Sequence, residues 1–204
     1  MQKRKLTSDK RRELTVDTVI ELSAKGDPAN ITTDNIAKHM HVTQGALFRH
    51  FANKEAIWET VIDTIAERLM QRFEHATNIA ETPLSALQAI FYAHIDFITE
   101  YPGVPPLIVS QLQLTNQTPA KRKVHTLLSA YRKRVESLLT EAQTSGDLDE
   151  YLDIEAAAIQ FIGTIQGLVV QSLIIGNIEH MVELAQRVFQ LYLHGIKNNH
   201  SEQV

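Results

Sequence analysis

Residues 30–58 contain two short helical patterns separated by a tight polar break, and this feature constrains the fold more than any other. Each pattern has apolar residues at helical spacing: Ile36, Ala37 and Met40 in the first, and Leu47, Phe48 and Phe51 in the second. The residues between them are His41, Val42 and Thr43. Two short helices joined by a turn of a few residues, close to a basic N-terminus, are typical of a helix-turn-helix DNA reader.

Residues that can cap a helix stand where each helix of this region is expected to begin. Thr32 or Thr33 precedes the first pattern, Thr43 precedes the second, and Asn53 precedes a third apolar pattern. A side-chain oxygen at such a position accepts a hydrogen bond from a backbone N–H that has no partner within the helix. The spacing therefore predicts three helix starts within about twenty residues.

The same stretch resembles the DNA-binding domain of TetR-type (tetracycline-repressor-like) bacterial transcriptional regulators. The matching residues stand at fixed spacings: Thr32, Ile36, Ala37, Val42, Thr43, Gly45, Leu47, Phe48, His50, Phe51, Lys54, Glu55 and Ile57. Phe48 stands where the family often has Tyr, which removes a phenolic contact to a DNA phosphate. The motif covers residues 10–60. The resemblance implies an N-terminal three-helix helix-turn-helix domain followed by a C-terminal helical domain that binds an effector and dimerises.

The whole chain is predicted to be all-α, with about nine helices and no strand-like alternation. Further helices are expected at residues 8–25, from 53 onward, and at 83–101, 107–114, 119–144, 153–175 and 178–197, with a break at Tyr101–Pro106. Residues 1–54 are assigned to the DNA-binding domain and residues 55–204 to the effector-binding and dimerisation domain. The helix that begins near Asn53 belongs to both halves.

Charge is distributed unevenly along the chain. Residues 1–54 hold ten Lys and Arg against six Asp and Glu, whereas residues 55–204 hold ten against eighteen. A basic head on an acidic body suits a protein that presents one end to a polyanion. Next to a helix-turn-helix pattern, we interpret the head as the DNA-binding end.

Several classes of protein are not indicated by the sequence. The chain has no cysteine, the basic N-terminus leads into no apolar signal segment, and residues 161–178 are interrupted by Gln166, Gln171 and Ser172. His94 and Asp96 are too close in sequence to share a helix face, so no metal site is predicted. No nucleophile motif or phosphate-cradling loop is recognisable. We therefore expect a cytoplasmic protein with no membrane segment, no cofactor and no enzymatic activity.

The expected DNA contacts lie at the start of the second short helix and around it: Thr33, Thr43, Gln44, Gly45, Ala46, Phe48, Arg49, His50 and Lys54. Gln44 can pair with adenine and Arg49 with guanine, each through two hydrogen bonds. The matching family positions imply phosphate contacts for Thr33, His50 and Lys54. Gln44 and Arg49 could instead only solvate the helix, and His50 could be a packed structural residue. Basic residues near the N-terminus could add nonspecific affinity or form a solvated tail: Lys3, Arg4, Lys5, Lys10, Arg11 and Arg12.

The two last helices are the most apolar in the chain. A helix that is apolar nearly all round must be buried on more than one side. The family resemblance implies that this pair forms half of an intersubunit four-helix bundle, and an intrachain core is the alternative. We expect Leu168→Arg or Val169→Arg to break the dimer, and double-stranded operator DNA with two inverted half-sites to be the second partner.

The family also binds a small molecule inside its C-terminal domain. Apolar residues with a few polar ones are candidates for that site: Met70, Phe73, Phe91, His94, Ile95, Ile98, Leu107, Gln111, Leu128, Tyr131 and Gln166. The few ionisable groups favour an apolar or amphipathic effector, and plain core is the alternative for each residue. The leading hypothesis is a dimeric, effector-released repressor. Two alternatives remain. One is a regulator that activates transcription or is controlled by a protein partner. The other is a helical ligand-binding or interaction module without operator recognition.

Overall fold

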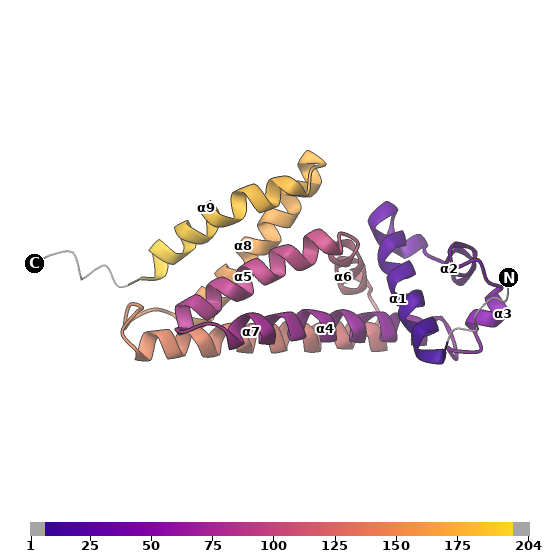
Figure 1. Cartoon of the computed structure of the whole chain (residues 1–204), viewed down its shortest axis with the longest axis horizontal. Helices are drawn as coiled ribbons and strands as arrows, with labels where there is room; N and C mark the ends of the chain where they lie inside the picture. The colour runs from indigo at the N-terminus through magenta and orange to yellow at the C-terminus, as the bar shows by residue number, and fades with distance from the viewer. Residues whose placement is uncertain (1–6, 198–204) are drawn as a thin grey trace, which may run out of the picture. The chain divides into compact units, whose positions relative to one another are not determined.

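The computed structural model describes residues 7–197 and is built from α-helices (Figure 1). The elements in chain order are α1 (Ser8–Lys25), a 3-10 turn η1 (Pro28–Asn30), α2 (Thr33–His39), α3 (Gln44–Leu47), α4 (Lys54–Asn78), α5 (Pro83–Glu100), α6 (Val104–Gln113), α7 (Pro119–Thr144), α8 (Ile154–Ile175) and α9 (Glu179–Ile196). Within residues 7–197 the only β-type pairing is an isolated bridge between Leu148 and Lys197. The prediction of an all-α fold is confirmed.

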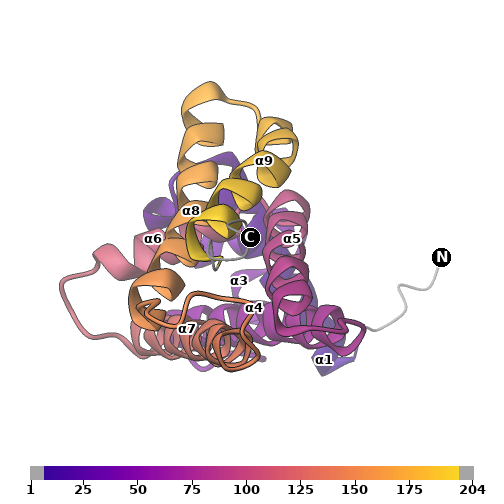
Figure 2. The ribbon, with the colours of Figure 1, turned by 90° about the vertical axis from the view of Figure 1, so that its left-hand side faces the viewer.

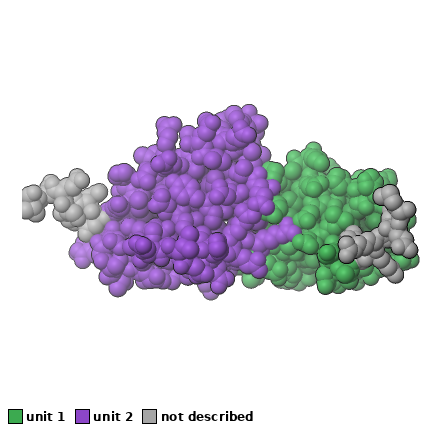
Figure 3. All heavy atoms as spheres, in the orientation of Figure 1, with its two compact units in different colours: residues 1–67, 101–126 green, residues 68–100, 127–204 purple. Residues whose placement is uncertain are grey.

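The chain divides into two compact units (Figure 3). Unit 1 comprises residues 1–67 and 101–126, and unit 2 comprises residues 68–100 and 127–204. Helices α4 and α7 each contribute residues to both units. This division follows packing, whereas the boundary predicted at residue 54 separates functions, and that boundary stays a prediction.

In unit 1, side-chain caps define where the short helices begin. Thr32 caps α2 through a capping box, in which its hydroxyl accepts from the backbone N–H of Asn35 while the Asn35 side chain accepts from the backbone N–H of Thr32. Thr43 caps α3, and Asn53 accepts from the backbone N–H of Ala56 at 2.8 Å. The predicted capping positions are therefore confirmed, with Thr32 chosen over Thr33.

Helix α6 begins earlier than the sequence predicted. The expected break extended to Pro106, but the helix starts at Val104, so Pro105 and Pro106 lie in its first turn. Proline is tolerated there because the first N–H groups of a helix have no intrahelical partner. The predicted start at Leu107 was wrong for this reason.

Gly103 brings the start of α6 into direct contact with the backbone of α1. A Cβ atom at Gly103 would lie 1.9 Å from the carbonyl oxygen of Ile20 and 2.8 Å from the amide nitrogen of Ala24. No larger residue fits at this position unless one of the two backbones moves. Gly103 therefore sets how closely α6 packs on α1 within unit 1.

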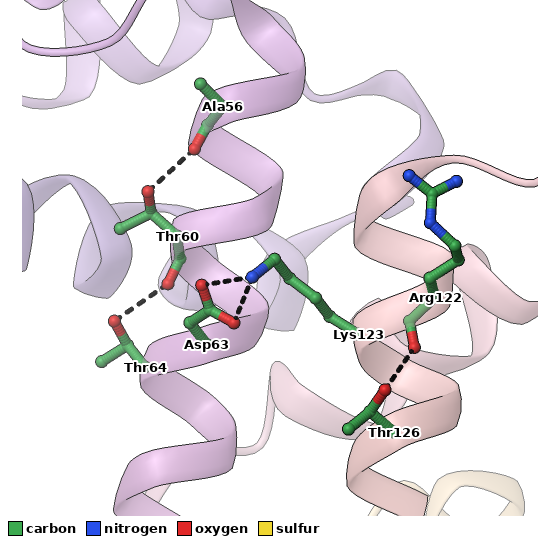
Figure 4. Close-up of polar contacts among 7 residues, drawn as sticks. All are labelled: Ala56, Thr60, Asp63, Thr64, Arg122, Lys123 and Thr126. Atoms are coloured by element: carbon green, nitrogen blue, oxygen red, sulfur yellow. Dashed lines mark hydrogen bonds and ion pairs between the residues drawn. The ribbon is translucent and has the colours of Figure 1, made fainter.

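An ion pair joins α4 and α7 within unit 1 (Figure 4). The Lys123 ammonium lies 2.7 Å from both carboxylate oxygens of Asp63. Lys121 donates to the carbonyl of Leu114 at 2.5 Å. These acceptors offset the unfavourable position of positive charge in the first turn of a helix.

Unit 2 has an aromatic cluster at its centre. The Phe91 ring lies 5.7 Å from Phe161 and 4.9 Å from Phe189, and Phe161 lies 5.5 Å from Tyr192. The Tyr192 hydroxyl donates to the carbonyl of Ala157 at 3.1 Å, so its polar atom is satisfied inside the core. These contacts link α5, α8 and α9, and α8 lies beside α9 (Figure 2).

The side of α8 turned away from this cluster is exposed within the protomer and is mostly apolar, although Gln160, Gln166 and Gln171 of this helix are exposed as well. Its exposed residues include Ile159, Val170, Leu173 and Ile174, and a Cβ added at Gly163 or Gly167 would meet no atom within 4 Å. By length and composition alone α8 could also cross a membrane, and within residues 7–197 it is the only such helix. A core helix can pass the same test, so the expectation of no membrane segment stays a prediction.

Candidate nucleic-acid interface

The turn between α2 and α3 is closed by backbone hydrogen bonds around His41. The amide of His41 donates to the carbonyl of Lys38, and the amide of Val42 donates to the carbonyl of Ala37, each at 3.0 Å. His41 has a φ of 54°, in the left-handed region, and it is the only non-glycine residue with positive φ among residues 7–197. Such a conformation costs an L-residue about 1 kcal/mol or more. The sequence pattern predicted a turn at this position but gave no sign of the left-handed backbone of His41.

The first turn of α3 is largely uncovered. Thr43, Gln44 and Gly45 are exposed, and Ala46 is half-buried. A Cβ added at Gly45 would meet no atom within 4 Å, so nothing in the described chain occupies the space beside it. This turn is where a helix-turn-helix protein presents its base-reading side chains.

Gln44 and Thr33 are in contact. The Nε2 atom of Gln44 donates to the Oγ1 atom of Thr33 at 2.5 Å. Thr33, the first residue of α2, is buried, with 8% of its surface exposed. The two residues were predicted as separate contacts, one to a base and one to a phosphate, and the structure brings their side chains together.

Helix α3 is shorter than the second apolar pattern indicated. It ends at Leu47, and residues 48–50 form a turn. Leu47 and Phe51, the other two apolar residues of this pattern, are buried, but Phe48 is 41% exposed. Phe48 therefore does not complete the apolar face on which it was placed.

Arg49 and His50 differ in their surroundings. Arg49 is exposed, and no hydrogen bond or ion pair to it is found within residues 7–197. The Nδ1 atom of His50 lies 3.2 Å from the hydroxyl of Ser8. Sequence spacing gave no sign of this second contact, because the two residues are 42 positions apart.

Lys54 lies at the first position of α4, with its ammonium 5.9 Å from the centre of the Trp58 ring. This contact holds the side chain near the helix start through a cation–π attraction. The nearby Asn53 side chain already accepts from Ala56, so an anion at this end of α4 would meet the remaining free N–H groups and Lys54.

Other basic residues of the DNA-binding domain either contact carboxylates or lie on α1. Lys38 forms an ion pair with Asp34 at 2.7 Å, and the Nε2 atom of His39 lies 3.0 Å from Glu21. Lys10 and Arg12 are exposed on α1. The N-terminal Lys3, Arg4 and Lys5, expected to add nonspecific affinity, lie outside the described residues.

The effector candidates include a polar pair in unit 2, formed by half-buried His94 and buried Tyr131. The Nδ1 atom of His94 lies 3.1 Å from the Tyr131 hydroxyl, and the Phe73 ring packs against both rings at 5.9 and 4.8 Å. Burial lowers the pKa of His94 to about 4 and raises the pKa of Tyr131 above its ordinary range. Both groups are therefore neutral near pH 7 and can exchange hydrogen bonds with an uncharged polar group.

The remaining effector candidates lie in different surroundings. Phe91, Ile95 and Ile98 are buried in unit 2, and Met70 and Leu128 are half-buried there. Leu107 and Gln111 are buried in unit 1. Gln166 is exposed on α8. Within residues 7–197 no group of three or more metal-ligating side chains is found.

Comparison with known families gives matches over most of the chain. Residues 16–61 match the family described as bacterial regulatory proteins, tetR family, and residues 83–188 match the tetracyclin repressor-like C-terminal domain. The chain is 25% identical to the fatty acid metabolism regulator protein of Bacillus subtilis, over 90% of this chain and 94% of that protein. It is 23% identical to the nucleoid occlusion factor SlmA of Vibrio cholerae, over 77% and 81% of the two chains.

Solved structures share the same fold. The transcriptional regulator FadR from Bacillus subtilis, in complex with stearoyl-CoA, has a TM-score of 0.78 at 24% identity, covering 90% of this chain and 98% of that chain. The ketosteroid transcriptional regulator KstR2 of Mycobacterium tuberculosis has a TM-score of 0.74 at 18% identity, covering 93% and 96%. At these identities the likeness shows the fold.

Proposed function

Because the chain belongs to the tetR family of bacterial regulatory proteins, and is thus a DNA-binding transcriptional regulator, we propose that it is a dimeric cytoplasmic repressor released from its operator by a small effector. One observation carries the DNA-reading part of the proposal. The first turn of α3 is uncovered, with Gln44 at its start and the exposed cation Arg49 just beyond its end.

The proposed contacts divide into base-reading and backbone-positioning groups. Gln44 reads adenine and Arg49 reads guanine, each through a pair of hydrogen bonds. Thr33, His50 and Lys54 contact phosphates, and Gly45 allows α3 to approach the bases closely. Thr43, Ala46 and Phe48 complete the surface, where the exposed Phe48 ring can meet a thymine methyl group.

Two substitutions separate these roles on a duplex from the chain's own promoter. Lys54→Ala is expected to weaken binding to all sequences and to reduce the dependence of log K on log salt by about one unit. Arg49→Ala is expected to cost roughly 1–3 kcal/mol and to relax preference at one base pair. Lys133→Ala, which removes an exposed cation from the unit 2 part of α7, is the control and should leave binding unchanged. An unchanged salt slope for Lys54→Ala would remove that residue from the phosphate contacts.

Dimerisation is proposed through the exposed apolar side of α8 together with α9. Val170 and Leu173 are 52% and 62% exposed in the protomer, so a partner would remove both from water. Leu168 is only 6% exposed, because it packs inside its own protomer. Leu168→Arg would therefore destabilise the protomer itself, so Val170→Arg is the better test of dimerisation.

Sedimentation of Val170→Arg is expected to give a folded monomer with greatly reduced operator affinity, since two linked heads bind inverted half-sites. Ile79→Arg, at a residue that is 78% exposed between α4 and α5, should remain dimeric. A wild-type chain that sediments as a monomer at micromolar concentration would contradict the proposal.

We propose that the effector has a long apolar part and, next to it, an uncharged polar group. The support is the neutral His94–Tyr131 pair beside Phe73, together with the relative FadR that is described with stearoyl-CoA. A fatty acyl thioester fits this chemistry. The proposal is confined to unit 2 residues and leaves out Gln166, which is exposed.

A thermal shift series with stearoyl-CoA, palmitoyl-CoA and free CoA tests the effector. The acyl thioesters should raise the melting temperature and release operator DNA, and free CoA should do neither. Operator should weaken acyl-CoA binding by the same factor, because coupling between two sites is reciprocal. If no apolar or amphipathic compound changes operator affinity, the alternatives that remain are control by a protein partner and constitutive operator binding.

A further inference from the structure

The hydrogen bond between Gln44 and Thr33 connects the first residue of α3 to the first residue of α2. The donor is the amide nitrogen of Gln44 and the acceptor is the hydroxyl oxygen of Thr33, 2.5 Å apart. Thr33 is 8% exposed, whereas Gln44 is exposed. A hydroxyl of a buried residue thus binds the amide nitrogen of a side chain that belongs to an exposed residue.

An amide presents different pairs of groups in its two orientations. Adenine offers the N6 amino group as a donor and N7 as an acceptor, so it pairs with the amide oxygen and with the N–H on the same side as that oxygen. The second N–H of Gln44 points away from the oxygen and is left over. A bond from this second N–H to Thr33 leaves the adenine-reading pair free and fixes the order of donor and acceptor.

The hydroxyl of Thr33 can have two roles at once. Its oxygen accepts from Gln44, and its hydrogen is then available to a DNA phosphate. A phosphate that takes this hydrogen prevents the hydroxyl from donating to the Gln44 oxygen. That removes the alternative in which the amide is rotated by half a turn.

We propose that Thr33 is a positioning residue that fixes the Gln44 amide in the orientation that reads adenine. This inference rests on the proposed DNA-binding role of Gln44 and adds a determinant of base specificity on α2. Without the hydroxyl, the Gln44 amide rotates freely, and preference at its base pair falls. Affinity at every other base pair changes only through the lost phosphate contact.

The test uses the full-length chain and an operator selected with the wild-type protein from a random pool of double-stranded DNA. Each base pair of that operator is then substituted in turn, and relative affinities are measured for wild type, Gln44→Ala, Thr33→Val and Thr33→Ser. Gln44→Ala should lose a preference for adenine of roughly 5- to 150-fold at one position. Thr33→Val should reduce the preference at that same position by at least about threefold, and the double variant should lose no more than Gln44→Ala.

The serine variant separates positioning from packing. Thr33→Ser keeps the hydroxyl and should keep the preference within about twofold, even if it folds less stably than wild type. An affinity that falls equally for all bases in Thr33→Val, with the adenine preference intact, would overturn the inference and leave Thr33 as a phosphate contact only. Unchanged base preferences in Gln44→Ala would overturn it as well, while operator binding by the wild type would keep the proposed function. A wild-type chain without any operator affinity would overturn both.

Discussion

The helix-turn-helix segment and the α8–α9 pair are both helical, but different interactions specify them. Helices α2 and α3 have seven and four residues, and each begins at a threonine that caps it. Helices α8 and α9 have 22 and 18 residues, and α9 has no side-chain cap. Helices as short as α2 and α3 are unstable alone, so their ends must be defined by local hydrogen bonds. Asp153 caps α8 as well, but the long pair depends mainly on apolar contacts between residues distant in sequence.

The largest expected effect comes from the aromatic cluster of unit 2. Phe161→Ala should lower the free energy of unfolding by about 3–5 kcal/mol, because it removes a buried ring and leaves a cavity. Urea titration followed by circular dichroism measures this effect. Tyr151→Ala, which truncates an aromatic residue that is 86% exposed, is the matched control and should change stability little. An equal loss in both variants would mean that the cluster does not hold unit 2 together.

Acid should weaken unit 2 through His94. Its folded-state pKa of about 4 lies below the ordinary 6.5, so between these values the unfolded chain binds more protons than the folded one. The contribution of His94 is present above pH 6.5 and is lost as the pH falls toward 4, on the order of 3 kcal/mol in total. Urea titrations from pH 7.5 to 4 should show a steeper loss for wild type than for His94→Gln. Parallel curves would rule out a buried neutral His94.

Loss of a helix cap should destabilise the DNA-binding domain. Thr32→Ala removes the hydroxyl that accepts from the Asn35 amide, while the backbone N–H of residue 32 can still donate to the Asn35 side chain, and it should lower the free energy of unfolding by about 1 kcal/mol. Thr115→Ala, in the loop between α6 and α7, provides the control. Hydrogen exchange of the α2 amides locates the effect. Exchange that increases in α8 but not in α2 would contradict the assignment of α2 to local capping.

The smallest effect is a gain in stability at the turn. His41→Gly should raise the free energy of unfolding by less than about 1 kcal/mol, because relief of the left-handed backbone exceeds the added flexibility of the unfolded chain. Gly146→Ala reverses the change at a glycine with φ of 83° and should destabilise the protein. If both variants shift the melting temperature in the same direction, backbone conformation is not the cause at His41.

The difference between local capping and long-range packing also explains which features could be predicted from the sequence. Helix starts at Thr32, Thr43 and Asn53 were predictable because a capping residue acts on an amide two or three positions away. The end of α3 was not predictable, since Phe48 continues the apolar spacing and only packing reveals that it is exposed. For α8, a nearly uniform apolar composition does not show which side faces its own protomer, so Leu168 was assigned to the wrong side.

Side-chain partners in the candidate site were the least predictable part. Gln44 and Thr33 could each be proposed for DNA from the family resemblance, yet their mutual hydrogen bond depends on how α2 and α3 cross. The contact between Ser8 and His50 depends in the same way on how α1 packs in unit 1. Sequence spacing reports neighbours along one helix, and these pairs lie on different segments.

The contact at Gly103 has a mechanical consequence. Most contacts between helices pass through side chains, which can absorb a small displacement by changing rotamer. At Gly103 the backbone of α6 touches the backbone of α1 near Ile20 with no side chain between them. Two backbones in contact leave no side chain to rearrange, so a displacement of Gly103 toward α1 would have to move the α1 backbone as well. Within unit 1, the Gly103 contact therefore sets a lower limit on the distance between α6 and α1.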